Sequence, residues 1–211
     1  MKIVVAQHKG GVGKTTLAVH VAGVLTNELD KVLLIDCDSQ ADAFRFFTKT
    51  KPNSSMELQE GMDEIDVLWN YKREKLSKKQ RFEEYEHIIV DIDTRVQNAL
   101  QVITEIEPDI IFIPVDRQKL SVEHLGEVLS LIARNEGIIN YPTRVKIVQM
   151  GSQHNLDDRL KTLQNIPKYL SYGFSIPYLD EFDDPLNNGK YIWNYSTEMD
   201  IKTIFQGVIY G

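Results

Sequence analysis

Short apolar runs alternate along the chain with longer segments in which apolar residues recur every three or four positions. The clearest runs lie at residues 3–6, 31–36, 87–91, 109–115 and 144–150. Their apolar character is continuous, which is typical of strands buried on both faces of a parallel sheet. Because the segments between them have helical periodicity, the pattern predicts an α/β fold. We expect a doubly wound, mostly parallel sheet with helices on both faces.

The remaining elements follow from the same pattern. Helical spacing covers residues 17–29, 41–47, 120–135 and 156–170, and a further helix begins at Val96. Residues 65–69 are predicted as a short edge strand and residues 172–178 as a return to the sheet, whereas the polar, turn-rich residues 48–61 are predicted as a loop. The 211 residues contain no internal repeat, low-complexity segment or interdomain linker, so we expect a single domain over residues 1–211.

Charge and cysteine content narrow the classes of function. The net charge of −7 argues against a strongly basic nucleic-acid binder, although it leaves room for a local basic patch. The single cysteine, Cys37, allows no intrachain disulfide and no iron–sulfur cluster, and it suits a reducing compartment. The chain has no signal-peptide layout and no apolar run long enough to span a bilayer. We therefore expect a cytoplasmic protein without membrane insertion.

A glycine-rich turn lies between the first predicted strand and the first predicted helix. It reads Lys9-Gly10-Gly11-Val12-Gly13-Lys14-Thr15-Thr16. Glycines allow backbone dihedrals that a Cβ would forbid, so that backbone N–H groups can close on phosphate oxygens, and the helix start adds further N–H groups. In this arrangement Lys14 reaches the β- and γ-phosphates and the Thr15 hydroxyl binds Mg²⁺. The turn therefore predicts a P-loop nucleotide-binding fold.

The turn departs from the ordinary phosphate-loop pattern, because His8 stands where that pattern has glycine and Lys9 adds a second lysine. In this respect it resembles the deviant Walker A motif, KGGxGK[ST], of the ParA/MinD family of ATPases. The resemblance implies ATP and Mg²⁺ as cofactors. It also implies that Lys9 crosses a dimer interface to the phosphates of the partner subunit. A glycine-rich turn that binds nothing is the rival interpretation, which two lysines and three glycines in this context disfavour.

Acidic residues end two of the predicted core strands, at the sheet edge that also carries the glycine-rich turn. The segment after residues 31–35 resembles the family's Walker A′ motif, D-x-D-P-Q, with Ser39 in place of proline. The resemblance implies that Asp38 orients the attacking water and that Asp36 lies near Mg²⁺. Asp91 resembles a Walker B carboxylate that holds Mg²⁺ through water. The rival interpretation is a solvated strand end, and Asp93 is either a second acid beside the metal or the N-cap of the next helix.

Three residues are expected near the base of the nucleotide. Gln149 and Met150 end a strand where this fold usually places the base, and in relatives a proline-containing segment such as the one with Pro177 packs on adenine. The expected catalytic residues are Lys9, Lys14 and Asp38, and the expected metal-binding residues are Thr15, Asp36 and Asp91. The expected nucleotide contacts are Lys9, Gly10, Gly11, Val12, Gly13, Lys14, Thr15, Thr16, Gln149, Met150 and Pro177.

In layout the chain resembles short ParA proteins, which lack an N-terminal helix-turn-helix domain. The resemblance implies a Mg²⁺-dependent ATPase that dimerises on ATP, binds DNA non-specifically and hydrolyses ATP when a ParB-like or other adaptor protein stimulates it. Its role would be plasmid or chromosome partition, with nucleoid association if DNA binding holds. Cations for DNA would come from the 72–81 run or from the later part of the chain, and a solvated helix face is the alternative for that run. The candidates are Lys72, Arg73, Lys75, Lys78, Lys79, Arg81, Arg144, Arg159, Lys161 and Lys168.

Other functions remain open at this point. A MinD-like ATPase acting on a membrane or a protein assembly would need a basic amphipathic C-terminal helix, yet residues 200–211 carry Lys202 as their one cation. A P-loop metabolic enzyme, such as a synthetase that activates a carboxylate, would need a polar substrate pocket. A tyrosine kinase would use the late tyrosines, which are dispersed and which we predict to be packing residues. They are Tyr169, Tyr172, Tyr178, Tyr191, Tyr195 and Tyr210.

Overall fold

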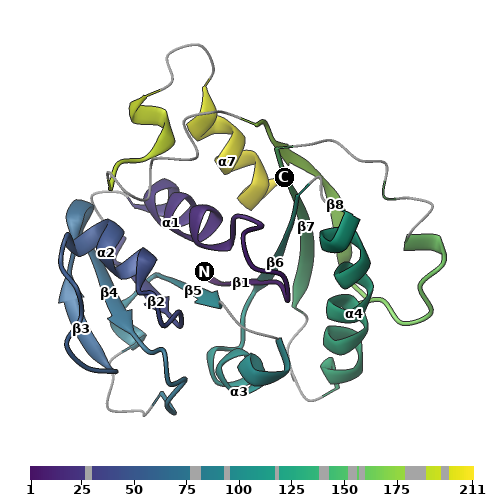
Figure 1. Cartoon of the computed structure of the whole chain (residues 1–211), viewed down its shortest axis with the longest axis horizontal. Coiled ribbons are helices and arrows are strands. Elements are labelled where there is room, and N and C mark those ends of the chain that lie inside the picture. The colour runs from purple at the N-terminus through teal and green to yellow at the C-terminus, as the bar shows by residue number, and fades with distance from the viewer. Residues whose placement is uncertain are drawn as a thin grey trace.

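One sheet organises the molecule (Figure 1). The structure is a computed structural model, and it describes residues 1–26, 30–76, 82–92, 96–116, 119–137, 143–151, 156, 160–178, 189–195 and 200–211. Within these residues eight strands pair in the order β3-β4-β2-β5-β1-β6-β7-β8. The strands are β1 (Lys2–Ala6), β2 (Val32–Asp36), β3 (Glu57–Glu60), β4 (Ile65–Trp69), β5 (His87–Ile92), β6 (Ile110–Val115), β7 (Arg144–Met150) and β8 (Leu170–Ile176). The β3–β4 pair is antiparallel and every other pair is parallel, which confirms the predicted mostly parallel sheet.

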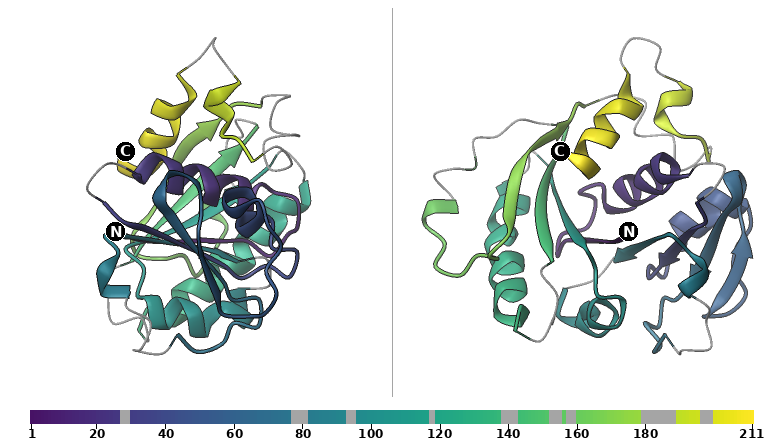
Figure 2. Two further views of the ribbon diagram at one scale, coloured as in Figure 1. Left: turned by 90° about the vertical axis from the view of Figure 1, so that its left-hand side faces the viewer. Right: turned by 180° about the vertical axis from the view of Figure 1, so that it is seen from behind.

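Helices cover both faces of this sheet, as Figures 1 and 2 show. The longer helices are α1 (Lys14–Leu25), α2 (Asp42–Thr48), α3 (Val96–Ile106), α4 (Lys119–Asn135) and α7 (Ile201–Tyr210). Three short 3-10 helices, η1 (Met62–Glu64), η2 (Phe82–Glu84) and η4 (Ile192–Asn194), connect other elements. Ile3 and Val5 of β1 pack with α1, α2 and α7, whereas Val4 packs with α3 and α4 on the opposite face. Alternate residues of one strand therefore enter two cores, which is the doubly wound arrangement predicted.

The left-hand edge of the sheet in Figure 1 differs from the prediction. Residues 48–61 are not wholly a loop, because residues 57–60 form β3 and the Met56 N–H donates to the Trp69 carbonyl at 2.7 Å. The segment at 65–69 is therefore the second strand from the edge rather than the edge strand. β3 has only four residues, and alternate positions of it face solvent. Its sequence is therefore short and polar like that of a turn, which is why the pattern predicted a loop.

The helix predicted at 156–170 is also wrong over much of its length. Residues 163–169 are not helical, and β8 begins at Leu170. The apolar spacing itself is real, because Leu156, Leu160 and Leu163 all pack against the α3/α4 core. Pro167 explains why no helix continues through the residues next to it, since proline removes an N–H donor and also disfavours the helical conformation of the residue before it.

Two smaller predictions have partial outcomes. α1 ends at Leu25, and residues 27–29 of the predicted helix lie outside the described residues, as does Asp93. The basic run after β4 begins with a turn at residues 71–72, and the described residues up to 76 contain no helix. Its remaining residues, 77–81, lie outside the part of the chain that the structure describes.

The strand register brings the predicted site residues to one edge. Asp36 is aligned with Asp91 across the β2–β5 pair, and Val5, near the end of β1, is also aligned with Asp91. On the other side of β1, Val115, Gln149 and Ser175 are aligned across β6, β7 and β8. Because parallel strands share their carboxyl edge, the loop after β1 and the acids after β2 and β5 are neighbours in space.

Candidate functional site

The loop from β1 to α1 depends on two glycines. Gly11 has φ +72° and Gly13 has φ +87°, the left-handed region in which a Cβ is strained. Gly13 is also the N-cap of α1, and its carbonyl accepts from the Leu17 N–H at 2.8 Å. A Cβ on Gly13 would lie 2.9 Å from Cε of Met150. The glycine pattern therefore shapes the loop and also lets it pack closely on the end of β7.

Both lysines of the loop have partners within the chain. Lys14 is 7% exposed, and its Nζ donates to the Lys9 carbonyl at 2.8 Å, so it curls back over the loop that precedes it. The Lys9 Nζ lies 3.0 Å from Oδ2 of Asp116, which directly follows β6, and each side chain is 15% exposed. The two amines therefore flank one short loop, and Asp116 holds one of them.

Two acids are buried side by side at the ends of β2 and β5. Asp36 is fully buried and Asp91 is 1% exposed. Burial, and then the negative charge of Asp91, raise the pKa of Asp36 well above its ordinary value, while backbone N–H groups of Phe44 and Asp38 oppose the rise. Two adjacent buried carboxylates are stable with a shared proton or with a cation. Thr15 lies in the first turn of α1, at the same edge of the sheet, and is partly exposed. Carboxylate and hydroxyl oxygens are donors that fit Mg²⁺.

Asp36 also builds the turn that carries Asp38. Its Oδ1 accepts from the Asp38 N–H and its Oδ2 from the Phe44 N–H, both at 2.8 Å. Asp38 Oδ1 accepts from the Gln40 N–H at 2.8 Å, and the Asp38 carbonyl accepts from the Trp69 indole N–H at 2.7 Å. These contacts fix the turn without the proline that Ser39 replaces. The partly exposed Asp38 carboxylate therefore has a defined place at the carboxyl edge of the sheet.

The residues predicted to surround the base lie on neighbouring strands. Gln149 is 5% exposed, and the next residue, Met150, is the one whose side chain lies against Gly13. Pro177 directly follows β8, and the Gly151 N–H donates to the Ile176 carbonyl at 2.8 Å, which ties the ends of β7 and β8 together. The structure thus brings Gln149, Met150 and Pro177 to the edge that carries the phosphate loop.

Sequence reasoning missed one buried residue close to the loop. The His20 Nδ1 lies 2.7 Å from the Thr16 carbonyl, and its Nε2 accepts from the Ile192 N–H at 2.9 Å. The ring also stacks on Phe205, with centroids 4.9 Å apart. Burial lowers the pKa of His20 to about 4, although the hydrogen bond to Thr16 opposes the shift. A histidine within an otherwise apolar helix face was the available signal.

The candidate DNA-binding cations do not form one patch in the described residues. Lys72 and Lys75 are exposed after the carboxyl end of β4, whereas Arg144 and Lys168 are exposed at the amino ends of β7 and β8, at the opposite edge of the sheet. Lys161 is also exposed. Lys78, Lys79, Arg81 and Arg159 lie outside the described residues.

The C-terminal elements bear on two of the alternatives. α7 has an apolar side, but Ile201, Phe205 and Val208 are fully buried in the core shared with α1. In the described part of the chain, none of the helices has the length and hydrophobicity needed to cross a bilayer.

The prediction that the late tyrosines pack in the core holds for Tyr191, which is 5% exposed. It is wrong for Tyr169, Tyr172, Tyr178, Tyr195 and Tyr210, which are exposed because they lie on the edge strand, in surface segments or on the outer side of α7.

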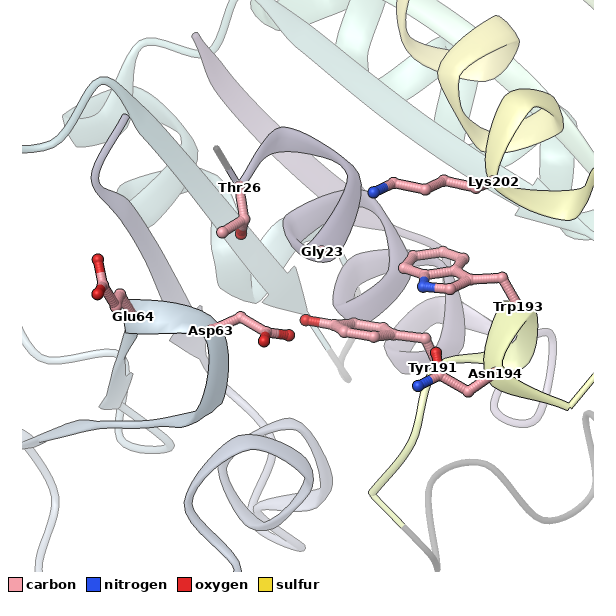
Figure 3. Close-up of a pocket in the computed structure, with 8 residues that line it drawn as sticks. All are labelled: Gly23, Thr26, Asp63, Glu64, Tyr191, Trp193, Asn194 and Lys202. Atoms are coloured by element: carbon pink, nitrogen blue, oxygen red, sulfur yellow. The ribbon is translucent and has the colours of Figure 1, made fainter. Parts of the chain in front are cut away.

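A pocket of about 600 Å³ lies at the far end of α1 (Figure 3). Its lining includes the stacked rings of Tyr191 and Trp193, 4.5 Å apart, with Lys202 over the Trp193 ring at 5.8 Å. Asp63 points toward the Tyr191 ring from the opposite wall (Figure 3), and burial and this negative charge raise the pKa of Tyr191. The remaining lining residues are Gly23, Thr26, Glu64 and Asn194. Since Gly23 and Thr26 end α1, this pocket is separate from the phosphate loop at its start.

A model of the CobQ/CobB/MinD/ParA nucleotide binding domain matches residues 3–192. The chain belongs to this family. The matched segment includes the phosphate loop, both acid-bearing strand ends and the strands next to the expected base. No curated protein matched the chain.

Solved structures with the same fold include several members of the CobQ/CobB/MinD/ParA family. Apo McdA from Cyanothece is similar with a TM-score of 0.77 and 17% identity over 99% of this chain and 97% of the other. MinD cell division protein from Aquifex aeolicus has a TM-score of 0.70 and 18% identity over 99% and 96%. A plasmid partition protein from Borrelia burgdorferi B31 bound to AMPPNP has a TM-score of 0.65 and 20% identity over 99% and 96%. At these identities the likeness establishes the shared P-loop fold.

Proposed function

We propose that this protein is a Mg²⁺-dependent ATPase that dimerises around ATP. The observation that carries the proposal is the meeting of Lys9, Lys14 and Asp38 at one edge of the sheet, beside the buried Asp36 and Asp91 pair. Two amines suit the charge of a triphosphate, and the acids suit a divalent cation and a water molecule. The similarity to a partition protein bound to AMPPNP supports the same ligand class.

The proposed roles follow from the location of each group. Lys14 and the loop N–H groups would bind the phosphates, and Thr15 and Asp91 would hold Mg²⁺, which would neutralise charge on the phosphates. Asp36 would lie near the metal while it also fixes the adjoining turn. Asp38 orients the water that attacks the γ-phosphate.

A contact made by Lys9 would explain why ATP binds the dimer more tightly than the monomer. A nucleotide drives dimerisation only if it binds the dimer more tightly than the monomer. We propose that Lys9 leaves Asp116 and contacts the nucleotide of the partner subunit, a contact that exists only in the dimer. Gln149, Met150 and Pro177 would then surround the adenine.

The biological role we propose is partition or positioning of a cargo. The ATP-bound dimer would bind DNA non-specifically and would release it after hydrolysis stimulated by a ParB-like or other adaptor protein, in the cytoplasm or on the nucleoid. The similarity to a plasmid partition protein and to McdA supports this class of role. Because the exposed cations lie at two opposite edges of the sheet, DNA would contact one group of them in each subunit rather than a single continuous patch.

The second candidate is a MinD-like ATPase that acts on a protein assembly. The similarity to MinD favours it. A membrane-bound version that uses α7 as its anchor is disfavoured, because the apolar side of α7 is already buried against α1. A membrane-binding assay with ATP and anionic vesicles tests the membrane-bound version, whereas a DNA-binding measurement separates the partition ATPase from an ATPase that acts on a protein assembly.

The decisive experiment measures ATP binding and mass in solution for the same set of variants. We expect the wild-type protein to bind ATP and to sediment as a dimer with a non-hydrolysable analogue. Lys14→Ala should lose ATP binding, whereas Lys9→Ala should bind ATP and remain a monomer. Lys31→Ala, an exposed lysine at the opposite edge of the sheet, is the control that should match wild type. A wild-type protein that stays monomeric with the analogue, or a Lys9→Ala protein that still dimerises fully, would contradict the proposal.

DNA binding needs its own measurement. We expect random-sequence duplex DNA to bind in the presence of ATP at low salt and to be released as salt rises, since contacts to phosphates release counterions. The anisotropy of labelled DNA, measured with ATP and with ADP, reports both effects. If no DNA binds at low salt in the presence of ATP, the protein would instead act as a scaffold that does not use DNA.

A further inference from the structure

Three side chains with metal-binding atoms meet between the phosphate loop and α4. His8 directly precedes Lys9, and His124 and Glu127 are one helical turn apart on α4, so they share a face of that helix. One ligand atom from each of the three lies within 4.8 Å of the other two. None of the three belongs to the predicted nucleotide site.

The spacing of these atoms is compatible with a coordination shell. His124 Nδ1 lies 3.2 Å from Glu127 Oε2, and His8 Nδ1 lies 3.5 Å from the same oxygen. Tetrahedral Zn²⁺ has bonds of about 2.0–2.1 Å, which separate two ligand atoms by about 3.3 Å. Two of the three distances between ligand atoms are therefore close to that value. The third distance, between the ligand atoms of His8 and His124, can shorten by side-chain rotation, because the His124 side chain is 40% exposed and that of Glu127 is 66% exposed.

We propose that His8, His124 and Glu127 form a binding site for a divalent transition-metal ion, with Zn²⁺ as the preferred ion and water in the fourth position. Two imidazoles and one carboxylate suit Zn²⁺, whereas Mg²⁺ and Ca²⁺ prefer oxygen ligands throughout. The ligands range from the nearly buried His8, 11% exposed, to the exposed Glu127. The ion therefore has an open path from solvent.

The backbone at His8 is already held in place for such an ion. Gln7 is fully buried, and its Oε1 accepts from the His8 N–H at 2.8 Å while its Nε2 donates to the Pro114 carbonyl at 3.3 Å. A bound ion would therefore connect the residue before Lys9 to α4. The site is complete within one chain and needs no nucleotide, so it does not depend on the proposed ATPase function.

The experiment uses the full, untagged chain without nucleotide. Zn²⁺ alone is titrated by calorimetry in buffer that contains millimolar Mg²⁺, which occupies oxygen-only sites such as the one at Asp36 and Asp91. We expect one Zn²⁺ per chain. Co²⁺ in place of Zn²⁺ should give the intense visible absorption of a tetrahedral centre, since the ligand geometry sets the spectrum.

Variants identify the ligands. His124→Ala and Glu127→Gln should each weaken Zn²⁺ binding by about tenfold or more, and circular dichroism should show both folded, because the two side chains lie on the surface of α4. His87→Ala is the matched control, since His87 also pairs with an acid, Asp30, but lies at the amino ends of the strands, away from α4 and the phosphate loop. It should bind Zn²⁺ as wild type does. Zn²⁺ binding that is absent from wild type, or is unchanged in both α4 variants, overturns the proposal.

Discussion

The Lys9 amine and the Asp116 carboxylate of the same chain form an ion pair, with 3.0 Å between Nζ and Oδ2. Each side chain is 15% exposed, so the pair is partly shielded from water. If Lys9 serves the nucleotide of a partner subunit, this pair must open first. Asp116 then competes with the phosphates for one amine and sets part of the free-energy cost of dimerisation.

We therefore predict that Asp116→Asn promotes dimerisation. The amide is nearly isosteric but carries no charge, so Lys9 leaves it more readily. A partly buried pair of this kind contributes on the order of 1 kcal/mol, which corresponds to a decrease of about two- to tenfold in the ATP concentration that gives half-maximal dimer. Sedimentation over a range of ATP concentrations measures it. Asp42→Asn, which removes the Asp42–Arg45 surface pair, is the control that should leave the curve unchanged.

Asp38→Ala should separate ATP binding from hydrolysis. The Asp38 carboxylate is proposed to orient water and makes no proposed contact with the phosphates, so ATP affinity should stay within about threefold of wild type. Loss of a positioned acid or base lowers rates by about 100-fold or more. The variant should therefore accumulate as an ATP-bound dimer, which phosphate release and sedimentation together detect. Hydrolysis at the wild-type rate would show that Asp38 has another role.

Gly13→Ala should harm both stability and nucleotide binding. Alanine at φ +87° costs on the order of 1–2 kcal/mol, and its Cβ would press on the Met150 methyl group. Urea unfolding should show this loss, and ATP affinity should fall as the loop shifts. Gly10→Ala is the control for stability, because no atom lies within 4 Å of its Cβ position and its φ is not in the left-handed region. Equal stability losses in the two variants would refute the steric explanation.

Acid should destabilise the fold through His20. Its pKa is about 4 in the folded state and about 6.5 in an unfolded chain, so the unfolded chain binds the proton more readily. The stabilisation is complete above pH 6.5 and is lost as pH falls from 6.5 to 4, by roughly 3 kcal/mol at pH 4. Urea unfolding at pH 7.5 and pH 5 measures it. His20→Gln should be less stable at pH 7.5 but should lose less on acidification, and an equal loss in both proteins would count against this assignment.

Local patterns predicted the parts of the site that are contiguous in sequence. The glycine-rich octamer and the acids that end β2 and β5 are each encoded within a few residues, and parallel pairing then brings them to one edge. The apolar runs predicted the core strands for the same reason, since burial on both faces leaves a continuous apolar signal.

Contacts between distant residues were not predictable in this way. Lys9 and Asp116 are 107 positions apart, and His20 and Ile192 are 172 positions apart, so no local pattern joins them. β3 was missed because an edge strand with one face in solvent has the composition of a turn. Two local signals were overlooked, the histidine at position 20 and Pro167, which excludes helix in the residues next to it before β8.

The indole of Trp69 supports the bend that carries Asp38. Because its N–H holds the Asp38 carbonyl from the end of β4, the bend after β2 does not rely on the amino acid at position 39 for its shape. Ser39 itself is exposed. The shape of the bend is therefore secured by the side chain at position 69 rather than by the residue at position 39.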